Sequence, residues 1–145
     1  MKISLITVCF NAALTIEDTI QSVLKQSYAS IEYIVIDGAS TDGTYGILED
    51  YKNKISLIIS EADDGLYHAM NKGLSVASGD IIGFLNADDV FADKFVLEKI
   101  AQSFLPDIDG VYGDLCYLDS NMMSIKRYWR SEINSPERWR LSWVP

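Results

Sequence analysis

The chain contains five short runs of apolar, often β-branched residues in which polar residues do not alternate. These runs lie at residues 3–10, 33–36, 56–59, 81–85 and 111–118. Between most of them apolar residues recur at helical spacing, at residues 16–24, 45–51, 66–77 and 93–104. A strand that is apolar on both faces is buried on both faces, and intervening amphipathic helices favour parallel pairing through right-handed crossovers. The sequence therefore predicts an α/β domain with a mostly parallel central sheet and helices on both faces.

Local signals predict where some of these elements begin. Thr15 can cap the first helix, together with Asp18 three residues later. Residues 122–129 are typical of a late antiparallel strand or hairpin arm, and Ser135-Pro136 is typical of the first turn of a short helix. Repeats, low-complexity tracts and long linkers are absent from the sequence, so we expect residues 1–145 to form a single domain.

The charge of the chain excludes one class of partner. Its 21 acidic and 12 basic residues give a formal charge of −9, whereas a protein that neutralises many phosphates of a nucleic acid needs a basic surface. We therefore expect no nucleic-acid partner. Residues 121–145 differ from the rest, because five of them are basic and two are acidic.

The cysteines and the length of the apolar runs bear on the cellular location of the protein. Cys9 and Cys116 both lie inside apolar runs without the spacing of metal ligands, which predicts two small buried side chains in a reducing environment. No uninterrupted apolar stretch reaches about 18 residues, the length that suggests a membrane span. We expect a cytoplasmic protein.

Acidic residues follow the ends of three predicted strands. Asp37 ends the second strand, Asp88 and Asp89 follow the fourth, and Asp114 lies in the fifth. Ligands bind beyond the carboxyl ends of strands in an open parallel sheet, so these carboxylates are expected to converge at one edge. Such crowding is relieved by a divalent cation, and Mg²⁺ or Mn²⁺ held by carboxylates is usually completed by phosphate oxygens. The alternative is that Asp88 and Asp89 only cap the following helix.

Four ordered motifs support a more specific interpretation. They are TVCFN at residues 7–11, IDGASTDGT at 36–44, SEADDGLYHAMNKG at 60–73 and FLNADD at 84–89. In order and spacing they resemble the family 2 nucleotide-sugar glycosyltransferases of the GT-A fold, most of all the branch that builds bacterial surface polysaccharides. The resemblance extends to about residue 119. It implies a Rossmann-like GT-A fold and transfer of a sugar, with inversion, from a nucleoside-diphosphate sugar, UDP-sugars being favoured, to a glycan or a lipid-linked acceptor.

The resemblance also implies roles for individual residues. Thr7 would lie against the nucleotide base, Asn11 would belong to the same nucleotide-binding group, and Asp37 would accept hydrogen bonds from the base. Asp88 would lie near the ribose. Asp89 would coordinate the Mn²⁺ or Mg²⁺ ion that bridges the diphosphate.

Three further residues depart from the family pattern or have two interpretations. His68 stands where close relatives usually carry Asp, and we expect a partly exposed helix residue. Lys72 either approaches the diphosphate or is a solvated helix lysine. Asp114 is expected to line the donor-sugar site, with the alternative that it substitutes for a catalytic base. The family carries that base in a later acidic motif that this sequence does not match, so we expect a donor-binding portion without the acceptor portion.

The last residues add two hypotheses about partners. Aromatic and basic side chains gather there, namely Tyr128, Trp129, Arg130, Trp139, Arg140 and Trp143. They suit peripheral contact with the inner face of a membrane, or else they cover the sheet or pack on a missing segment, where an exposed patch would promote self-association into a homo-oligomer.

Other functional classes give competing interpretations. A non-catalytic module that binds a nucleotide sugar or a partner subunit is the main alternative to an enzyme. A dinucleotide-dependent oxidoreductase needs a Gly-x-Gly-x-x-Gly turn after the first strand, and a nucleotidyltransferase needs a Gly-rich, Arg-containing loop there. Residues 9–13 have the sequence CFNAA, so both classes are disfavoured.

Overall fold

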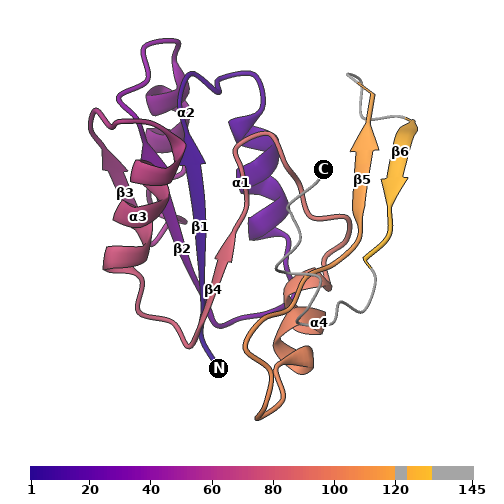
Figure 1. The fold of residues 1–145 in the computed structure, drawn as a ribbon. Helices are drawn as coiled ribbons and strands as arrows, with labels where there is room; N and C mark the ends of the chain where they lie inside the picture. The colour runs from indigo at the N-terminus through magenta and orange to yellow at the C-terminus, as the bar shows by residue number, and fades with distance from the viewer. Residues whose placement is uncertain (120–123, 132–145) are drawn as a thin grey trace. The chain divides into compact units, whose positions relative to one another are not determined.

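The computed structural model describes residues 1–119 and 124–131, and the chain divides into two compact units, Met1–Ser103 and Phe104–Pro145. The first unit alternates strands and helices (Figure 1). Its strands are β1 (Ile3–Cys9), β2 (Ile31–Asp37), β3 (Leu57–Ser60) and β4 (Ile81–Phe84). Its helices are α1 (Ile16–Leu24), α2 (Thr44–Asp50), α3 (Leu66–Val76) and α4 (Val96–Ser103). The predicted α/β organisation is confirmed.

The four strands of the first unit form one parallel sheet in the order β3-β2-β1-β4. β1 is central, and all seven of its side chains are buried. It pairs with β2 from Ile3↔Ile31 to Cys9↔Asp37, and with β4 from Ile3↔Ile81 to Ile6↔Phe84. Parallel pairing brings the carboxyl ends of the strands to the same edge of the sheet.

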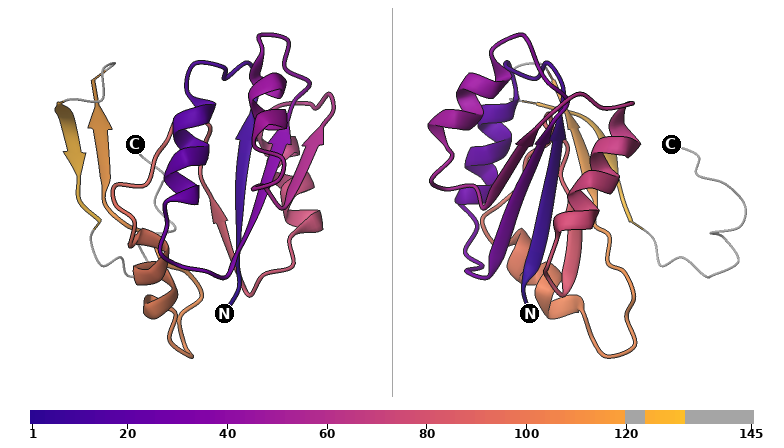
Figure 2. Two further views of the ribbon diagram at one scale, coloured as in Figure 1. Left: turned by 180° about the vertical axis from the view of Figure 1, so that it is seen from behind. Right: turned by 90° about the vertical axis from the view of Figure 1, so that its left-hand side faces the viewer.

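Helices cover the two faces of this sheet, as predicted. In the right-hand view of Figure 2, α3 lies on one face, and α1 and α2 lie on the other. Beneath α3, Ala69 packs in a core cluster with Ile6, Val8, Ile34 and Ile36. The continuous apolar strands thus supply side chains to both layers, which is why they do not alternate.

Gly73 allows α3 to approach the sheet closely. A Cβ atom at this position would lie 2.5 Å from Cγ2 of Ile6, whereas a Cβ atom on Gly46 in α2 would meet nothing within 4 Å. The close packing of α3 on the sheet therefore requires glycine at position 73, whereas α2 has room for a larger residue at position 46.

A polar network closes the opposite, amino-terminal edge of the sheet. The Glu32 carboxylate accepts hydrogen bonds from Lys2 Nζ at 2.7 Å, from the Ser4 hydroxyl, and from the hydroxyl and amide of Ser78 at 2.6 and 2.8 Å. These donors, the Lys2 ammonium first, lower the pKa of Glu32 to about 2. The network fastens the chain entering β4 to the first two strands.

The second unit contains an antiparallel hairpin of β5 (Leu115–Leu118) and β6 (Ile125–Trp129), so the predicted late antiparallel strand is confirmed. Both strands are exposed along their whole length, and Cys116 is exposed with them. The predicted burial of Cys116 is therefore wrong, whereas that of Cys9 is confirmed. The apolar run at residues 111–118 predicts a core strand, but β5 lies in a two-stranded ribbon that has no second layer of its own among the described residues. The helix predicted at Ser135-Pro136 lies outside the described residues, as do Trp139, Arg140 and Trp143.

One predicted helix cap differs in detail. Thr15 occupies the N-cap position of α1, but its hydroxyl makes no capping bond and lies 3.4 Å from the carbonyl oxygen of Ala12. The predicted Thr15–Asp18 capping box is wrong because the hydroxyl turns back toward the preceding turn. Among the helices that the structure describes, none is long and apolar enough to cross a membrane.

The contrast between the two glycines predicts opposite effects of alanine. Gly73→Ala should lower the free energy of unfolding by about 1–3 kcal/mol, because the new methyl group overlaps Ile6 and this cost exceeds the gain in helix propensity. Gly46→Ala, the matched control, should raise it by up to about 1 kcal/mol. Urea unfolding measures both changes, and equal effects would contradict the close contact.

The amino-terminal network predicts a pH-dependent contribution to stability. Glu32→Gln should lower the free energy of unfolding by about 1–3 kcal/mol near pH 7, because charge-assisted hydrogen bonds are lost. The folded pKa of Glu32 is about 2 against an ordinary value of 4.5, so its stabilisation is complete above 4.5 and is lost as the pH falls toward 2. Urea unfolding across this range should show wild type and variant converging; a constant difference would argue against the network.

Candidate functional site

The carboxyl edge of the sheet brings three loops together. The chain leaves β1 at Phe10, β2 at Gly38 and β3 at Glu61. The amide of Gly38 donates to the carbonyl oxygen of Cys9 at 2.9 Å, and the amide of Glu61 donates to that of Asp37 at 3.0 Å. The backbone pairing of the sheet thus continues for one residue beyond the strands, and this fixes where each loop begins.

Asp37 is the polar centre of this edge. Its side chain is completely buried. One carboxylate oxygen accepts the Ser40 hydroxyl, the other accepts the Ser60 hydroxyl at 2.6 Å, and the Ser40 amide lies 3.1 Å away. A buried carboxylate is stable when donors surround it, and here the donors are Ser40, in the loop after β2, and Ser60, the last residue of β3. Asp37 therefore joins the loop after β2 to the end of β3, where the next loop begins.

Cys9 lies against Asp37 in the same buried layer. Its sulfur is 3.7 Å from Oδ1 of Asp37. Burial, and then the negative charge of Asp37, raises the pKa of the Cys9 thiol. A thiol held protonated is a poor nucleophile, so Cys9 contributes packing and not covalent chemistry.

Asn11 links the loop after β1 to the loop after β2. Its backbone is left-handed, with φ of 51°. Its amide donates to the Ser40 hydroxyl at 2.8 Å, and its side-chain oxygen accepts from the Thr41 amide at 2.9 Å. Asparagine tolerates this conformation better than most residues. The structure thus gives Asn11 a loop-joining role, and its predicted nucleotide contact stays a prediction.

Thr7 lies in the protein interior and not at the surface of the hollow. Its side chain is completely buried, and its hydroxyl accepts a hydrogen bond from the Tyr33 hydroxyl at 3.1 Å. The predicted position of Thr7 against a nucleotide base stays a prediction.

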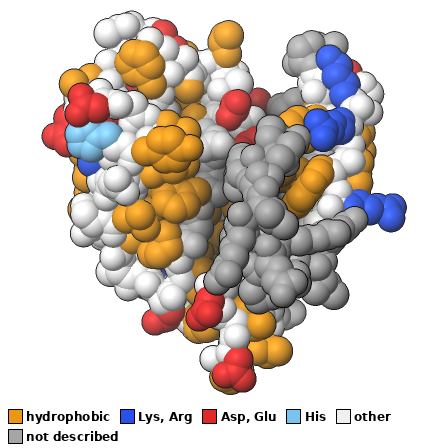
Figure 3. Space-filling view, in the orientation of Figure 1, with side chains coloured by type: hydrophobic (Ala, Val, Ile, Leu, Met, Phe, Trp, Pro, Cys, Tyr) orange, Lys and Arg blue, Asp and Glu red, His pale blue; other side chains and the backbone are white. Residues whose placement is uncertain are grey.

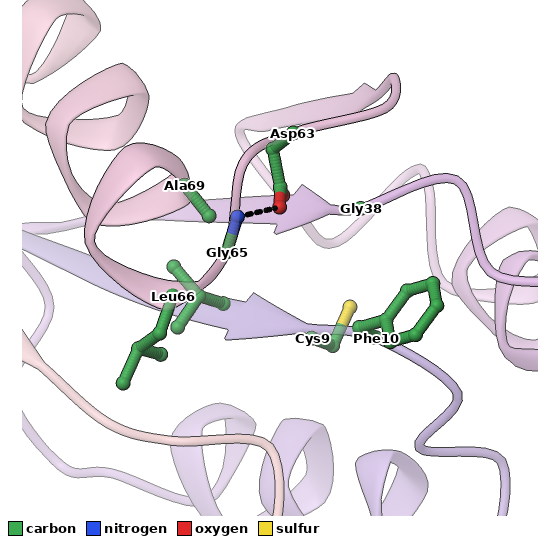
Figure 4. A pocket seen from close by; sticks show the side chains of 8 residues that line it. Cys9, Phe10, Gly38, Asp63, Gly65, Leu66 and Ala69 are labelled. Atoms are coloured by element: carbon green, nitrogen blue, oxygen red, sulfur yellow. Dashed lines mark hydrogen bonds between the residues drawn. The ribbon is translucent and has the colours of Figure 1, made fainter.

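A hollow of about 310 Å³ opens beside this edge, between the ends of β1 and β2 and the start of α3 (Figure 4). Val8, Leu66 and Ala69 supply an apolar lining, and the ring of Phe10 is 65% exposed. The remaining lining residues are Cys9, Gly38, Asp63 and Gly65. A hollow with apolar walls, an exposed aromatic ring and one carboxylate suits a flat, partly polar ring.

Asp63 supplies the carboxylate of this hollow. Its Oδ1 accepts from the Gly65 amide at 2.8 Å, which forms the tight turn that opens α3 (Figure 4). A Cβ atom on Gly38 would lie 2.9 Å from its Oδ2, so glycine at 38 leaves room for that oxygen. Sequence reasoning missed Phe10, Asp63, Leu66 and Ala69; the Asp-x-Gly pattern of residues 63–65, a turn signal before a helix, could have indicated Asp63.

Lys72 and His68 lie on α3 and contact different residues of the segment 61–65 that leads into this helix. Lys72 Nζ is 3.0 Å from a Glu61 carboxylate oxygen and 3.1 Å from the carbonyl oxygen of Ala62. His68 is partly exposed, as predicted, and its Nδ1 accepts the Asp64 amide at 3.0 Å. Figure 3 shows the single histidine at the surface among acidic side chains. Lys72 is not the solvated lysine that one prediction described, because its side chain is only 15% exposed.

Asp88 and Asp89 follow β4 at the same edge of the sheet. Both side chains are exposed, and Asn86 Nδ2 lies 3.4 Å from Oδ2 of Asp89. The main chain here is anchored by Thr19 of α1, whose buried hydroxyl donates to the Asp89 carbonyl oxygen at 2.9 Å. Although the residue is exposed, its carboxyl group loses part of its hydration to surrounding protein atoms, and this desolvation, followed by the neighbouring charge of Asp88, raises the pKa of Asp89. Two crowded carboxylates of this kind gain from a cation.

Asp114 belongs to the second unit. It accepts hydrogen bonds from the Tyr128 hydroxyl and from the amide and hydroxyl of Ser131, both at 2.8 Å. The Tyr128 hydroxyl, followed by these serine donors, lowers the pKa of Asp114. A carboxylate so stabilised is a weaker base. Its predicted place in a donor-sugar site stays a prediction.

The described carboxylates do not assemble into an all-protein metal cage. Within residues 1–119 and 124–131, no three His, Cys, Asp or Glu side chains are placed to hold one ion. The pair Asp88 and Asp89 instead matches the Mg²⁺ or Mn²⁺ pattern in which one or two carboxylates share the ion with phosphate oxygens of a substrate.

Known proteins similar to this chain are glycosyltransferases. TuaG of Bacillus subtilis, named for teichuronic acid biosynthesis, is 42% identical over 100 residues, which cover 67% of this chain and 39% of TuaG. The Escherichia coli UDP-Glc:alpha-D-GlcNAc-diphosphoundecaprenol beta-1,3-glucosyltransferase WfgD is 35% identical over 120 residues, 82% of this chain and 47% of WfgD. The chain thus spans less than half the length of these relatives.

Two solved structures share the fold. S. aureus TarS 1–349 in complex with UDP-GlcNAc is 31% identical, with a TM-score of 0.65, over 70% of this chain and 30% of that one. The mannosyltransferase PcManGT of Pyrobaculum calidifontis, in complex with GDP-Man and Mn²⁺, is 26% identical, with a TM-score of 0.68, over 81% of this chain and 35% of that one. These likenesses confirm the predicted GT-A fold. Since the glycosyl transferase family 2 model matches residues 4–142, the chain belongs to that family.

Proposed function

We propose that this chain binds the nucleoside-diphosphate-sugar donor, a UDP-sugar, of a glycosyltransferase that builds a bacterial polysaccharide. The observation that carries the proposal is the hollow between β1, β2 and α3, which lies at the same sheet edge as Asp88 and Asp89. The TarS complex with UDP-GlcNAc and the name of WfgD, a UDP-Glc enzyme, support uridine as the base.

In this proposal the hollow takes the base and not the whole donor. A volume of about 310 Å³ is at the small end of ligand pockets. Uracil carries one N–H donor on its ring edge, and a carboxylate acceptor pairs with it. Asp63 has an oxygen beside Gly38 at the hollow, whereas Asp37 is buried and holds three hydrogen bonds from Ser40 and Ser60. We therefore assign the base contact to Asp63 and the support of the loops to Asp37.

Asp89, with Asp88 beside it, would hold a divalent cation, Mn²⁺ or Mg²⁺. The fit rests on the raised pKa of Asp89 and on two carboxylates that are exposed at the edge. The structure of PcManGT with GDP-Man and Mn²⁺ supports this assignment. When bound, the ion would offset negative charge on the departing diphosphate. Thr19 keeps the Asp89 main chain in place for that contact.

The acceptor would be a glycan or a lipid-linked sugar, as the name of WfgD suggests, and transfer would invert the anomeric carbon in one displacement. We infer that a lipid-linked acceptor would bring the enzyme to a membrane surface, on its cytoplasmic side. The base that takes the acceptor proton needs a pKa nearer neutrality than Asp114, whose pKa is lowered by Tyr128 and Ser131. We therefore assign that base to another part of the full transferase.

The metal assignment predicts a specific loss of binding. Calorimetry should show UDP binding that strengthens with Mn²⁺, and Asp89→Ala should weaken binding in Mn²⁺ by at least about tenfold, because the ion loses its carboxylate. Asp50→Ala, which removes an exposed carboxylate at the end of α2, should bind like wild type. Absence of UDP binding to the wild-type chain in Mn²⁺ would refute the proposed function.

The base assignment predicts a change of selectivity. Asp63→Asn should weaken UDP binding by about 10- to 100-fold and narrow the preference for UDP over CDP, because cytosine has an acceptor where uracil has its ring N–H. Asp64→Asn, the neighbouring control, should keep the preference. Asp37→Asn should instead lower the free energy of unfolding by about 1–3 kcal/mol. If Asp63→Asn keeps wild-type selectivity, the assignment to Asp63 is wrong.

A further inference from the structure

Lys72 is more buried than the other described lysines that form ion pairs. Its side chain is 15% exposed, against 41% for Lys2, 59% for Lys52 and 64% for Lys99. Its ammonium reaches back ten residues along the chain, to the Ala62 carbonyl oxygen and the Glu61 carboxylate. Enclosing a lysine costs side-chain entropy and hydration, so its contacts must be sufficient to offset that cost.

The segment that Lys72 contacts is acidic, so a positively charged partner stabilises it. Residues 61–65 run from β3 to α3 and carry three acidic side chains, Glu61, Asp63 and Asp64. Like charges so close repel one another and would drive the segment outward. Two side chains of α3 contact the segment: His68 accepts a hydrogen bond from the Asp64 amide, and Lys72 supplies the positive charge.

The same segment carries Asp63 to the hollow. Between the Lys72 contacts at 61 and 62 and the turn at Gly65, only Asp63 and Asp64 remain to be placed. With both ends of this stretch fixed, the Asp63 carboxylate has little freedom to move away from Gly38, where a Cβ atom would lie 2.9 Å from its Oδ2 at the hollow.

We propose that Lys72 is a positioning residue for base recognition: it holds segment 61–65 against α3 and thereby sets the Asp63 carboxylate that faces the base. The inference rests on the proposed function, since it assumes that a uridine nucleotide occupies the hollow. It differs from a diphosphate contact, because Lys72 then acts on the nucleoside half of the ligand and leaves the phosphates to other groups.

The test compares a ligand that has phosphates with one that has none. NMR titrations of the full chain with uridine, and with UDP and CDP in Mg²⁺, give affinities for wild type, Lys72→Met and Lys72→Arg. Lys72→Met should weaken the binding of uridine and of UDP by the same factor, about three- to tenfold, and narrow the preference for UDP over CDP. Lys72→Arg, which keeps the positive charge and the hydrogen-bond donors, should restore most of the affinity and most of the preference. Lys52→Met, the control that removes an exposed ion-paired lysine, should change neither the affinities nor the preference.

The outcomes separate the possible roles of Lys72. Loss of UDP binding with unchanged uridine binding would assign the lysine to the diphosphate and overturn the proposal. A loss without any change in the preference for UDP over CDP would indicate a general structural role and would also overturn it, as would wild-type affinities in Lys72→Met.

A measurement without ligand keeps the inference separate from the proposed function. Hydrogen exchange at the amides of residues 61–65 should be several-fold faster in Lys72→Met than in wild type, while the amides of β1 and β2 keep their protection. If the wild-type chain binds no nucleotide, the proposed function fails and base recognition by Lys72 fails with it. Faster exchange at residues 61–65 in Lys72→Met would still show that Lys72 holds this segment against α3. Unchanged exchange would overturn that contact as well.

Discussion

The site depends on the parallel pairing of β1 with β2 and β4. The pairs Cys9↔Asp37 and Ile6↔Phe84 bring the ends of three strands to one edge, and the loops beyond them start from fixed points. A shift of one residue would turn Ile6 and Val8 away from α3 and toward the face that α1 and α2 cover (Figure 2), and the packing of both layers would be lost. Burial of both faces of β1 therefore fixes the register, and the register fixes which side chains can meet a ligand.

The carboxylates at this edge are stabilised in two different ways. Asp37 is buried among hydroxyl and amide donors, and Asp63 accepts the Gly65 amide, so protein groups already offset their charge. Asp89 has one long contact with Asn86 and a negative neighbour in Asp88, and its pKa is raised. The sequence predicts that several acidic residues share one cation, but in the structure only Asp88 and Asp89, after β4, remain as candidate ligands among these described carboxylates. The crowding of acidic residues in the sequence does not show which carboxylates need a metal ion, because hydrogen bonds from protein groups can also stabilise a carboxylate.

The fold could be predicted largely from the sequence, because long apolar runs and helical spacing depend on burial, which is local to each element. The prediction failed where burial depended on partners: Cys116 lies in an apolar run, yet its ribbon leaves it exposed. The site was harder to predict. Asp37 is identified by its position after a strand, but its burial follows from Ser40 and from Ser60, 23 residues away. The role of Lys72 likewise follows from a fold-back contact ten residues along the chain, which spacing alone does not reveal.

The order of the strands also suggests how a long ligand would lie. The hollow is at the ends of β1 and β2, whereas Asp88 and Asp89 follow β4 on the other side of β1. Neighbouring strands are about 4.8 Å apart, so β2 and β4 are separated by roughly 10 Å across the sheet. A donor with its base in the hollow would therefore extend across the end of β1 to bring its diphosphate to the acidic pair. Phe10, the first residue beyond β1 and 65% exposed, lies on that path, so the ring that borders the base would also border the ribose. In this arrangement the order of the strands would determine the direction in which the donor lies along the edge of the sheet.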